Sequence, residues 1–250
     1  PTAPCTNGNA TYTNRTLSVG TSDVTLSVVC WGSCDPCVYP PQAPVGITCS
    51  VGNPGVAFTD DIDPTTGWSG DIGTGNGIWR INSGGTISSG TGPSGAHSGN
   101  DYLFFESSTG GLDTATAITP AIDLTAGTGD AELTFWMHAY GSGINTLDVG
   151  VSTSATGPFT NLYTWAGEYQ QSNSDPWSQV GVNLASYVGQ TVYVSFTYAR
   201  GSAGISYRAD IAIDYVQVTT CLQCVAPSAL MASNVTTNSA DVSWLSLIHI

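Results

Sequence analysis

The sequence predicts an all-β protein, an antiparallel jelly-roll β-sandwich with short β fragments on either side of it. Residues 132–152 show this most clearly. In ELTFWMHAYGSGINTLDVGVS, apolar and polar side chains alternate with a period of two, and glycines interrupt the pattern. Thirty glycines, thirteen prolines and the lack of a long stretch with helical periodicity favour strands joined by turns. We expect residues 132–140 and 146–152 to pair as an antiparallel hairpin around the Gly-Ser-Gly turn.

Turn-forming clusters of Gly, Ser, Asp and Pro divide the rest of the main body into short alternating segments. About ten such segments without helices are typical of a sandwich or jelly roll. The predicted strands are residues 56–59, 78–81, 102–106, 116–118, 132–140, 146–152, 159–164, 177–182, 191–198 and 211–218.

Composition divides the chain into three parts. Residues 1–44 hold two short strands, a cysteine cluster and a Pro-rich exit, YPPQAP, which is typical of an extended spacer. Their strands resemble the closing strands of immunoglobulin-like modules in secreted proteins of Bacteroidetes-type bacteria, so we interpret them as the C-terminal remnant of a preceding module. Residues 45–221 form the main domain. Residues 222–250 resemble the truncated start of a fibronectin type III domain.

The two ends of the chain indicate a longer natural protein. The sequence begins at Pro1 without a methionine, and its last six residues, LSLIHI, resemble the translation of a sequencing-library adapter. We therefore expect neighbouring domains of a longer chain on both sides.

The charge is strongly acidic. Four Arg, no Lys and eighteen acidic residues give a formal net charge of −14. Nucleic acid is excluded as a partner, because phosphate binding needs basic side chains that displace counterions. Anionic membrane surfaces are excluded for the same reason, and no apolar run is long enough for membrane insertion. Fifteen of the acids are Asp, which serve in turns or can converge on a hard cation such as Ca²⁺.

Seven cysteines lie near the two ends of the chain, and none lies between residues 50 and 220. This distribution favours disulfides that flank a domain in an oxidising, extracellular compartment, secreted or at the cell surface. Two C-x-x-C pairs leave a zinc ribbon as an alternative. The candidates are Cys5, Cys30, Cys34, Cys37, Cys49, Cys221 and Cys224.

Motifs in the main body stand in the order expected of a MAM domain, and the chain is similar to that family over most of residues 56–221. The matching residues are Gly67-Trp68, Trp79-Arg80, residues 90–99, residues 102–106, Thr119-Pro120, residues 133–141, Leu147-Asp148-Val149, Trp177 and residues 210–214. The resemblance implies a jelly-roll sandwich that serves adhesion, oligomerisation or substrate recognition outside the cell rather than catalysis.

The cysteine pattern departs from the family. Family members usually carry four cysteines in two local disulfides, but Thr66 and Glu132 occupy the two inner positions here. Cys49 and Cys221 remain near the outer positions. Cys221 could instead pair with Cys224, or Cys49 with the N-terminal cluster, and spacing alone does not decide.

Family members often hold a cation between the loop after the first strand and the last strand, which implies a structural Ca²⁺ or Na⁺ here. Asp214 is the implied ligand from the last strand, with Asp60 and Asp63 on the first-strand side and Asp101 as a weaker candidate. Ligands that are all oxygen select such ions over zinc.

Asp214 has two interpretations from its strand alone. It is in phase with Val216 and Val218, so a regular strand directs all three to one face. If that face is the core, the carboxylate needs a counter-charge from Arg208 or a metal ion. Alternatively the strand bulges, and Asp214 is solvated while Ile211 and Ile213 point inward.

Aromatic residues suggest where a ligand binds. Trp68, Trp79, Trp136 and Trp177 match family positions and are expected in the core. Trp165 lies in the predicted loop TWAGEYQQSNSDPW near Tyr169, and a flat ring beside amides is suited to gripping a sugar, although such a loop can simply pack on its own sandwich. Tyr207 and Arg208 form a second such loop.

Catalytic motifs are not found. There is no H-E-x-x-H, no G-x-S-x-G elbow, and only three Glu, each explained by its strand position. His138 is expected at the surface or as a residue that anchors a loop. The sequence therefore predicts a non-catalytic extracellular module that binds glycan or protein ligands in adhesion. The alternative is an accessory or targeting domain of a secreted peptidase or glycoside hydrolase whose catalytic domain lies outside this sequence, and a spacer without a ligand is a third hypothesis.

Overall fold

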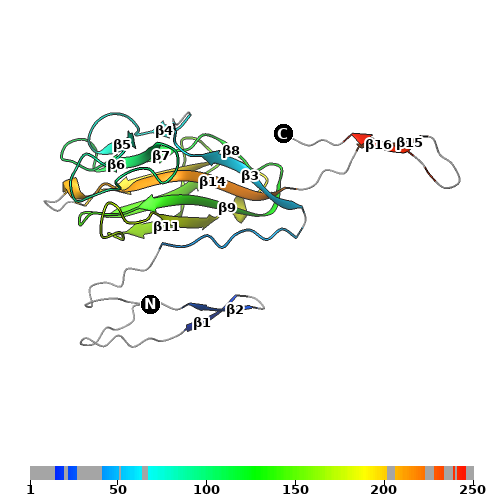
Figure 1. The fold of residues 1–250 in the computed structure, drawn as a ribbon, viewed down its shortest axis with the longest axis horizontal. Coiled ribbons are helices and arrows are strands. Elements are labelled where there is room, and N and C mark those ends of the chain that lie inside the picture. The colour runs from blue at the N-terminus through cyan, green and yellow to red at the C-terminus, as the bar shows by residue number, and fades with distance from the viewer. Residues whose placement is uncertain are drawn as a thin grey trace.

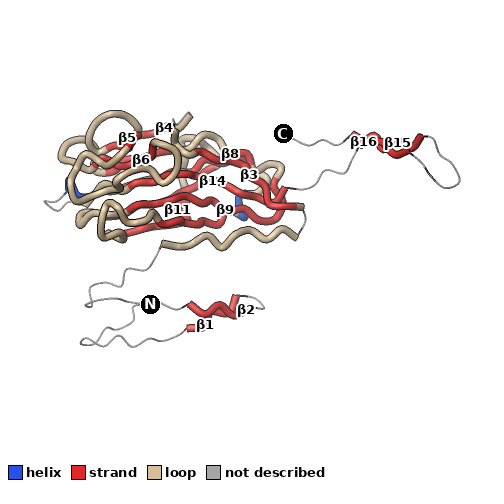
Figure 2. The backbone as a smooth tube through the Cα atoms, viewed as in Figure 1, coloured by secondary structure: helices blue, strands red, loops and turns tan. Residues whose placement is uncertain are grey.

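The computed structural model describes residues 15–19, 22–26, 41–50, 52–63, 67–201, 206–222, 228–233, 239 and 241–245. The described part is almost entirely strand and loop, with only two single-turn 3₁₀ helices, Ala185–Tyr187 and Ser206–Arg208 (Figure 2). All pairings between its strands are antiparallel. The described residues contain no helix that is long and apolar enough to cross a membrane.

Two six-stranded sheets pack face to face and form the main body (Figure 1). Sheet I has the order β12 (Ser178–Asn183), β9 (Gly127–His138), β14 (Ala212–Leu222), β6 (Asp101–Glu106) and β5 (Ile78–Ser83), with β3 (Asn53–Asp60) also paired to β14. Sheet II has the order β11 (Thr160–Ala166), β10 (Thr146–Ser152), β13 (Thr191–Ala199), β7 (Thr114–Ile118) and β4 (Ser69–Gly70), with β8 (Ile122–Asp123) also paired to β13. The predicted all-β jelly-roll sandwich is confirmed.

Two further strand pairs lie outside these sheets in the sequence. They are β1 (Arg15–Val19) with β2 (Ser22–Leu26), and β15 (Ser228–Ser233) with β16 (Asp241–Leu245). The domain boundaries at 44/45 and 221/222, and the immunoglobulin-like and fibronectin type III assignments of the flanks, stay predictions.

Alternation along the strands builds the core between the sheets. Leu133, Phe135 and Met137 of β9 are fully buried and face side chains of sheet II. Phe135 meets Phe196 edge to face, with 5.1 Å between ring centroids. Because burying one large apolar side chain contributes about 1.5–3 kcal/mol, this interior is the main source of stability.

The predicted hairpin of residues 132–140 and 146–152 is wrong. β9 pairs with β12 and β14 in sheet I, whereas β10 pairs with β11 and β13 in sheet II. The chain crosses between the layers where Gly141 adopts a φ of 140° and forms a bridge with Thr91. An added Cβ at Gly141 would meet the Arg208 carbonyl oxygen, so this crossing requires glycine. Alternation identified the strands, but it does not say which neighbour each one pairs with.

A loop covers part of the outer face of sheet I and forms a second, smaller core. Residues 84–100, hereafter the covering loop, pack Ala96 against a cluster of Tyr102, Phe104 and Ala212, with Trp177 at its border. The Tyr102 hydroxyl donates to the Gly84 carbonyl, 2.8 Å away. Sheet I is therefore buried on both faces at this end.

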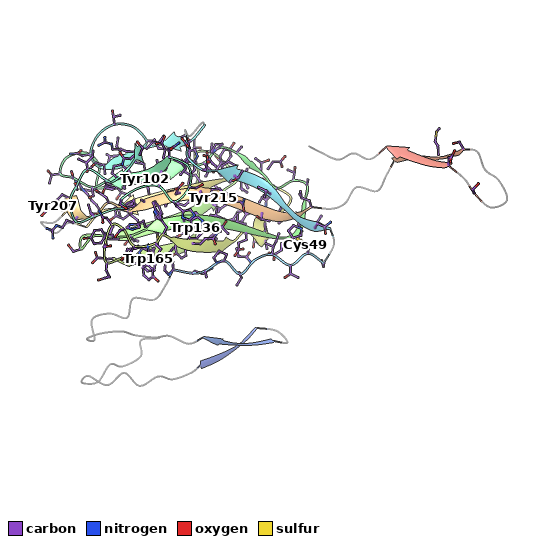
Figure 3. All side chains as sticks on the ribbon, in the orientation of Figure 1. Cys49, Tyr102, Trp136, Trp165, Tyr207 and Tyr215 are labelled. Carbon is purple, nitrogen blue, oxygen red and sulfur yellow. A yellow bond between two sulfur atoms is a disulfide. The ribbon has the colours of Figure 1, made fainter. Side chains whose placement is uncertain are left out.

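One disulfide joins Cys49 to Cys221, 172 residues apart (Figure 3). It settles the pairing of these two cysteines and excludes the alternatives that gave either another partner. The remaining five cysteines lie outside the described residues. In the chain-entropy account, closing a loop of this length stabilises the folded state by about 5 kcal/mol.

Beside the disulfide, Glu132 holds the segment that leads into the domain. Its carboxylate accepts the backbone N–H of Val45 at 2.8 Å and that of Gly46 at 3.0 Å. Gln42 adds a pair of hydrogen bonds to the edge of β12 through Gly181. Where the family has an inner cysteine, a carboxylate thus fixes the chain by hydrogen bonds.

Candidate functional site

Asp214 lies in a bulge of β14 and holds the covering loop. The register of β14 against β9 shifts between Asp214 and Gln217, and Tyr215 takes a φ of 44°. The Asp214 side chain is fully buried. Its Oδ2 accepts the N–H of His97 at 2.7 Å and of Ser98 at 2.9 Å, and its Oδ1 accepts the N–H of Tyr215 at 2.7 Å.

This arrangement combines parts of both predicted alternatives for Asp214 and corrects each. The strand does bulge, but Asp214 is buried rather than solvated. Its charge is balanced by peptide N–H groups rather than by Arg208, whose guanidinium lies over the Tyr207 ring at 5.5 Å. Burial raises the pKa of Asp214 to about 6; the three N–H donors oppose this shift, and the nearby charge of Asp61 adds to it.

The other predicted cation ligands are spread along the same edge of sheet I. Asp60 accepts the N–H of Ile62 at 2.7 Å and the indole N–H of Trp68 at 2.8 Å. Asp63 accepts both the backbone and the side-chain N–H of Asn100. Asp101 is half-buried at the start of β6.

These donors do not fit a closed cation site. No group of three His, Cys, Asp or Glu side chains in the described residues is arranged to hold a metal ion. Ca²⁺ takes six to eight oxygen ligands, whereas three of the four predicted ligands, Asp60, Asp63 and Asp214, already accept N–H donors. The Ca²⁺ or Na⁺ ion stays a prediction from the family resemblance.

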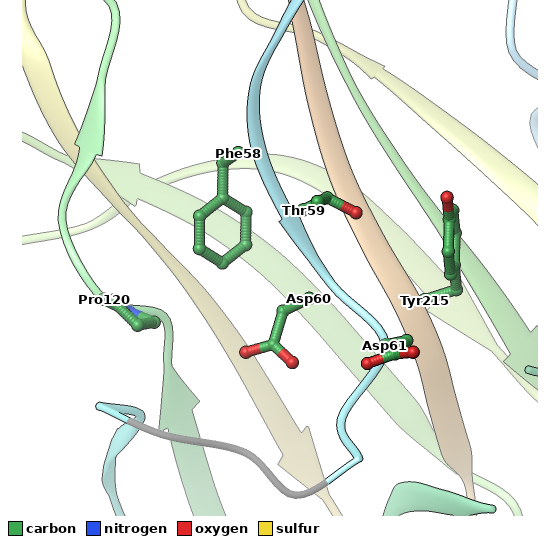
Figure 4. Close-up of a pocket in the computed structure, with 6 residues that line it drawn as sticks. All are labelled: Phe58, Thr59, Asp60, Asp61, Pro120 and Tyr215. Carbon is green, nitrogen blue, oxygen red and sulfur yellow. The ribbon is translucent and has the colours of Figure 1, made fainter. Parts of the chain in front are cut away.

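An open hollow of about 510 Å³ lies over β3 beside this edge (Figure 4). It is lined by Phe58, Thr59, Asp60, Asp61, Pro120 and Tyr215. Two residues with positive φ, Ile62 at 66° and Tyr215 at 44°, bring its two walls together, and for a β-branched residue such as Ile62 this conformation is costly. Asp61 is exposed at the rim.

The predicted ligand-binding aromatics occupy different environments. Trp165 lies in β11 rather than in a loop, its ring is only 7% exposed, and its indole N–H donates to the Gly167 carbonyl at 2.7 Å. The predicted loop position of Trp165 is therefore wrong, because β11 continues further than its sequence pattern suggests, and the Trp165 ring packs on the sandwich, as the second interpretation held. Tyr169 packs edge-on against it. Tyr207 and Arg208 are exposed, and their role in ligand binding stays a prediction.

Three further predictions from the sequence need correction. His138 is fully buried and packs edge-on against Trp177, because the covering loop and residues 171–177 close over this part of sheet I. Burial lowers its pKa to about 4, so its imidazole is neutral at pH 7. Trp136 and Trp177 are half-buried on the outer face, whereas Trp79 is in the main core and Trp68 packs against it, as expected.

The sequence analysis did not predict one pair of buried acidic residues. Asp210 and Glu106 lie side by side on the outer face of sheet I, because β14 and β6 pair Ala212 with Phe104 in this register. Asp210 Oδ1 accepts the Ser107 N–H at 2.9 Å and the Ser107 hydroxyl at 2.6 Å, and Glu106 lies 3.6 Å from Arg80. Burial raises the pKa of Asp210 to about 7. Its position in the sequence could have indicated this burial. Asp210 lies two residues before Ala212 and four before Asp214, so a regular strand directs all three side chains to the same face.

A stacked ring pair marks the border of the covering loop. His97 is exposed and lies flat on Trp136, with 3.8 Å between ring centroids and 16° between planes. Beyond it, the register puts Thr134 of β9, Gln217 of β14 and Thr59 of β3 in one row across the outer face. This face is open to solvent between His97 and the segment at Pro44, which packs on Gly181.

The structure defines a disulfide-stapled jelly-roll sandwich with one partly covered sheet face. A family model for the MAM domain, described as meprin/A5/mu, matches residues 58–224. The chain belongs to the MAM domain family.

Three solved structures are similar to this chain. The K1 cleaved adhesin domain of Lys-gingipain from Porphyromonas gingivalis W83 is 22% identical, with a TM-score of 0.46 over 67% of this chain and 98% of that one. A cyclase from Fischerella sp. TAU is 14% identical, with a TM-score of 0.45 over 66% and 89%. The CBM22-1 xylan-binding domain of Xyn10C from Paenibacillus barcinonensis is 11% identical, with a TM-score of 0.36 over 71% and 100%.

Proposed function

We propose that the MAM domain of this chain is a non-catalytic recognition module that binds glycan or protein ligands in adhesion outside the cell. The observation that carries this proposal is how the domain uses its buried acids. Asp214 and Asp210 accept hydrogen bonds from loop backbone and a serine, and Glu106 lies against Arg80. These groups hold loops in place, so the buried acids serve the structure rather than a reaction.

The disulfide supports an extracellular location. Cys49 and Cys221 are bonded, and such bonds form and persist in oxidising surroundings. Family membership supports the same location, so we place the module on a secreted or cell-surface protein.

Binding to a defined surface tests this function. Beads coated with the chain are allowed to settle on a glycoprotein layer and on the same layer after enzymatic removal of its glycans. Retention on the first layer only indicates a glycan ligand, and retention on both indicates a protein ligand. The proposal is contradicted if neither layer retains the beads at densities where beads coated with a known adhesin are retained.

Within this assay, the exposed pair Tyr207 and Arg208 tests the loop predicted to bind ligand. The double variant Tyr207→Ala, Arg208→Ala removes two exposed side chains at one end of the sandwich (Figure 3). We expect weaker retention if this loop binds. The matched control is Tyr193→Ala, which removes a partly exposed tyrosine ring from β13 of sheet II.

The accessory-domain alternative has its own test, which is the composition of the longer natural chain. A peptidase or glycoside hydrolase domain in the same chain would favour targeting of an enzyme over adhesion alone.

A further inference from the structure

The outer face of sheet I contains an open strip whose polar side chains are unpaired. We define the open strip as six residues of β12, β9, β14 and β3 in and between two neighbouring rows. They are Gln179 and Trp136 in one row, Thr134, Gln217 and Thr59 in the other, and Tyr215 in the bulge of β14 between the two rows. All six are exposed or half-buried. Since neighbouring strands lie about 4.8 Å apart, four strands make the strip about 14 Å wide.

The hydrogen-bonding groups of the open strip are free. Among the described residues, no side-chain hydrogen bond is made by Gln179, Gln217, Thr134 or Thr59, and the indole N–H of Trp136 has no acceptor. The outer face of sheet II differs. There the Thr116 and Thr197 hydroxyls lie 2.9 Å apart, and Asn161 donates to Asp148 at 3.0 Å. These polar side chains on sheet II thus satisfy one another, while those of the open strip have no such side-chain partners.

Flat rings lie at one end of the open strip. His97 rests on Trp136, and burial lowers the pKa of His97, so the outward face of this stack is uncharged at pH 7. Tyr215, in the bulge of β14, lines the hollow over β3 together with Thr59 and Asp61 (Figure 4). Aromatic faces contribute apolar contact, and the amides and hydroxyls between them supply directional donors and acceptors.

The negative charge around the open strip favours neutral ligands over acidic ones. The charged group beside the open strip is Asp61, which is exposed, and the chain as a whole carries −14. The three arginines of the two main sheets and their loops are engaged elsewhere: Arg80 with Glu106, Arg200 with Asp113 and Arg208 with Tyr207. An acidic ligand would be repelled, whereas a neutral polyhydroxylated one would not.

From this geometry we infer that the open strip is a binding face for a neutral oligosaccharide, whose apolar sugar faces lie on His97–Trp136 and Tyr215 and whose hydroxyls bond to Gln179, Gln217, Thr134 and Thr59. This assignment rests on the proposed recognition function and names the ligand class and its site. The segment at Pro44 and the covering loop bound the face at its two ends.

Titration calorimetry on the full chain tests the assignment, with xylohexaose and cellohexaose as neutral probes and hexagalacturonate as an acidic one. We expect a neutral hexasaccharide to bind, and its Kd to rise at least about tenfold in Gln217→Ala and in Tyr215→Ala. Gln190→Ala and Thr160→Ala are the matched controls, because both residues are exposed and lie away from the open strip. Thr59→Ala pairs with Thr160→Ala and should weaken binding by a smaller factor. Unchanged melting temperatures establish that each variant is folded.

Three outcomes would overturn the assignment. They are equal weakening by the control variants, tighter binding of hexagalacturonate than of the neutral sugars, and no binding of either neutral probe. The bead assay separates this failure from failure of the recognition function. If the chain still adheres and the open-strip variants adhere equally well, the function stands and the open strip is not its site. If neither assay shows binding, both proposals fall.

Discussion

The two faces of β9 carry the same alternation but are buried in different ways. Leu133, Phe135 and Met137 face the other sheet and meet only hydrocarbon and aromatic rings. Trp136 and His138, on the opposite face, are covered by loops. The inner face is shielded by regular structure, and the outer face by chain that polar anchors hold in place.

This difference shows what each face demands of the sequence. An apolar face needs only the right period and volume, because hydrophobic burial has no direction. A face covered by a loop needs acceptors for the loop's backbone N–H groups, because a buried unpaired donor costs about 1–3 kcal/mol. Asp214 meets that need for His97 and Ser98.

The largest effect is expected when adjacent residues on the two faces of β9 are truncated one at a time. Phe135→Ala should lower the free energy of unfolding by about 3–5 kcal/mol, because it leaves a cavity in a closed core. Trp136→Ala should cost about half as much, since its ring is half-buried and solvent can fill the space. Urea unfolding of both variants measures this. Equal losses would mean that the loop-covered face is packed as firmly as the core.

Removing the loop anchor should have the next largest effect. Asp214→Ala is expected to cost about 2 kcal/mol, because three backbone N–H groups lose their acceptor. Hydrogen exchange should speed up at His97 and Ser98 while the amides of β9 that pair with β12 stay protected. Asp214→Asn keeps one acceptor oxygen and should lose less. A uniform increase of exchange over both sheets would show that the loop and the core unfold together.

The buried Asp210 should make stability depend on pH. Its pKa of about 7 lies above the unfolded value of 3.8, so the folded state binds the extra proton between these values. This contribution to stability is full at low pH and is lost as the pH rises from about 4 to 7. Asp210→Asn removes the titration and should gain on the order of 2 kcal/mol relative to wild type between pH 4 and pH 8.

Thermal unfolding across this pH range checks the Asp210 prediction. His138 acts in the opposite direction, because its pKa of about 4 lies below the unfolded 6.5, so His138 costs stability as the pH falls from 6.5 to 4. Because both proteins contain His138, its contribution cancels when the free energy of unfolding of Asp210→Asn is compared with that of wild type. A difference that does not change with pH would contradict the assignment.

The smallest expected effect is that of a chelator. Since Asp214 already accepts three N–H donors and no group of three metal-binding side chains occurs in the described residues, EDTA should lower the melting temperature by less than about 2 °C. A larger drop that CaCl₂ restores and that Asp60→Asn abolishes would instead establish the cation that the family resemblance predicts.

The strands and the inner core could be predicted from the sequence, because both follow from a period of two. The partners of the strands could not. Residues 132–152 look like a hairpin locally, yet the chain crosses to the other sheet at Gly141, which depends on its contacts with Thr91 and Arg208. Those contacts are distant in sequence and leave no periodic signal.

The candidate site was predictable only in part. Asp214 was identified by its phase and the motif around it, but its partners are backbone N–H groups, which every residue except proline carries. His138 was misplaced because a Gly- and Ser-rich segment gives no sign that it packs on a sheet. Trp165 was misplaced because β11 ends beyond its last clear alternation.

The bond between Cys49 and Cys221 also determines how the domain responds to tension. The two Cα atoms are 5.5 Å apart, while the 172-residue interval between them could reach roughly 580 Å if fully extended. A pull on the chain from both sides first loads the hydrogen bonds of residues 42–46 to sheet I, and once these have broken it passes through the sulfur bridge rather than through the strands between the two cysteines. Under load, the sandwich keeps its shape and its exposed face for as long as that single covalent link holds.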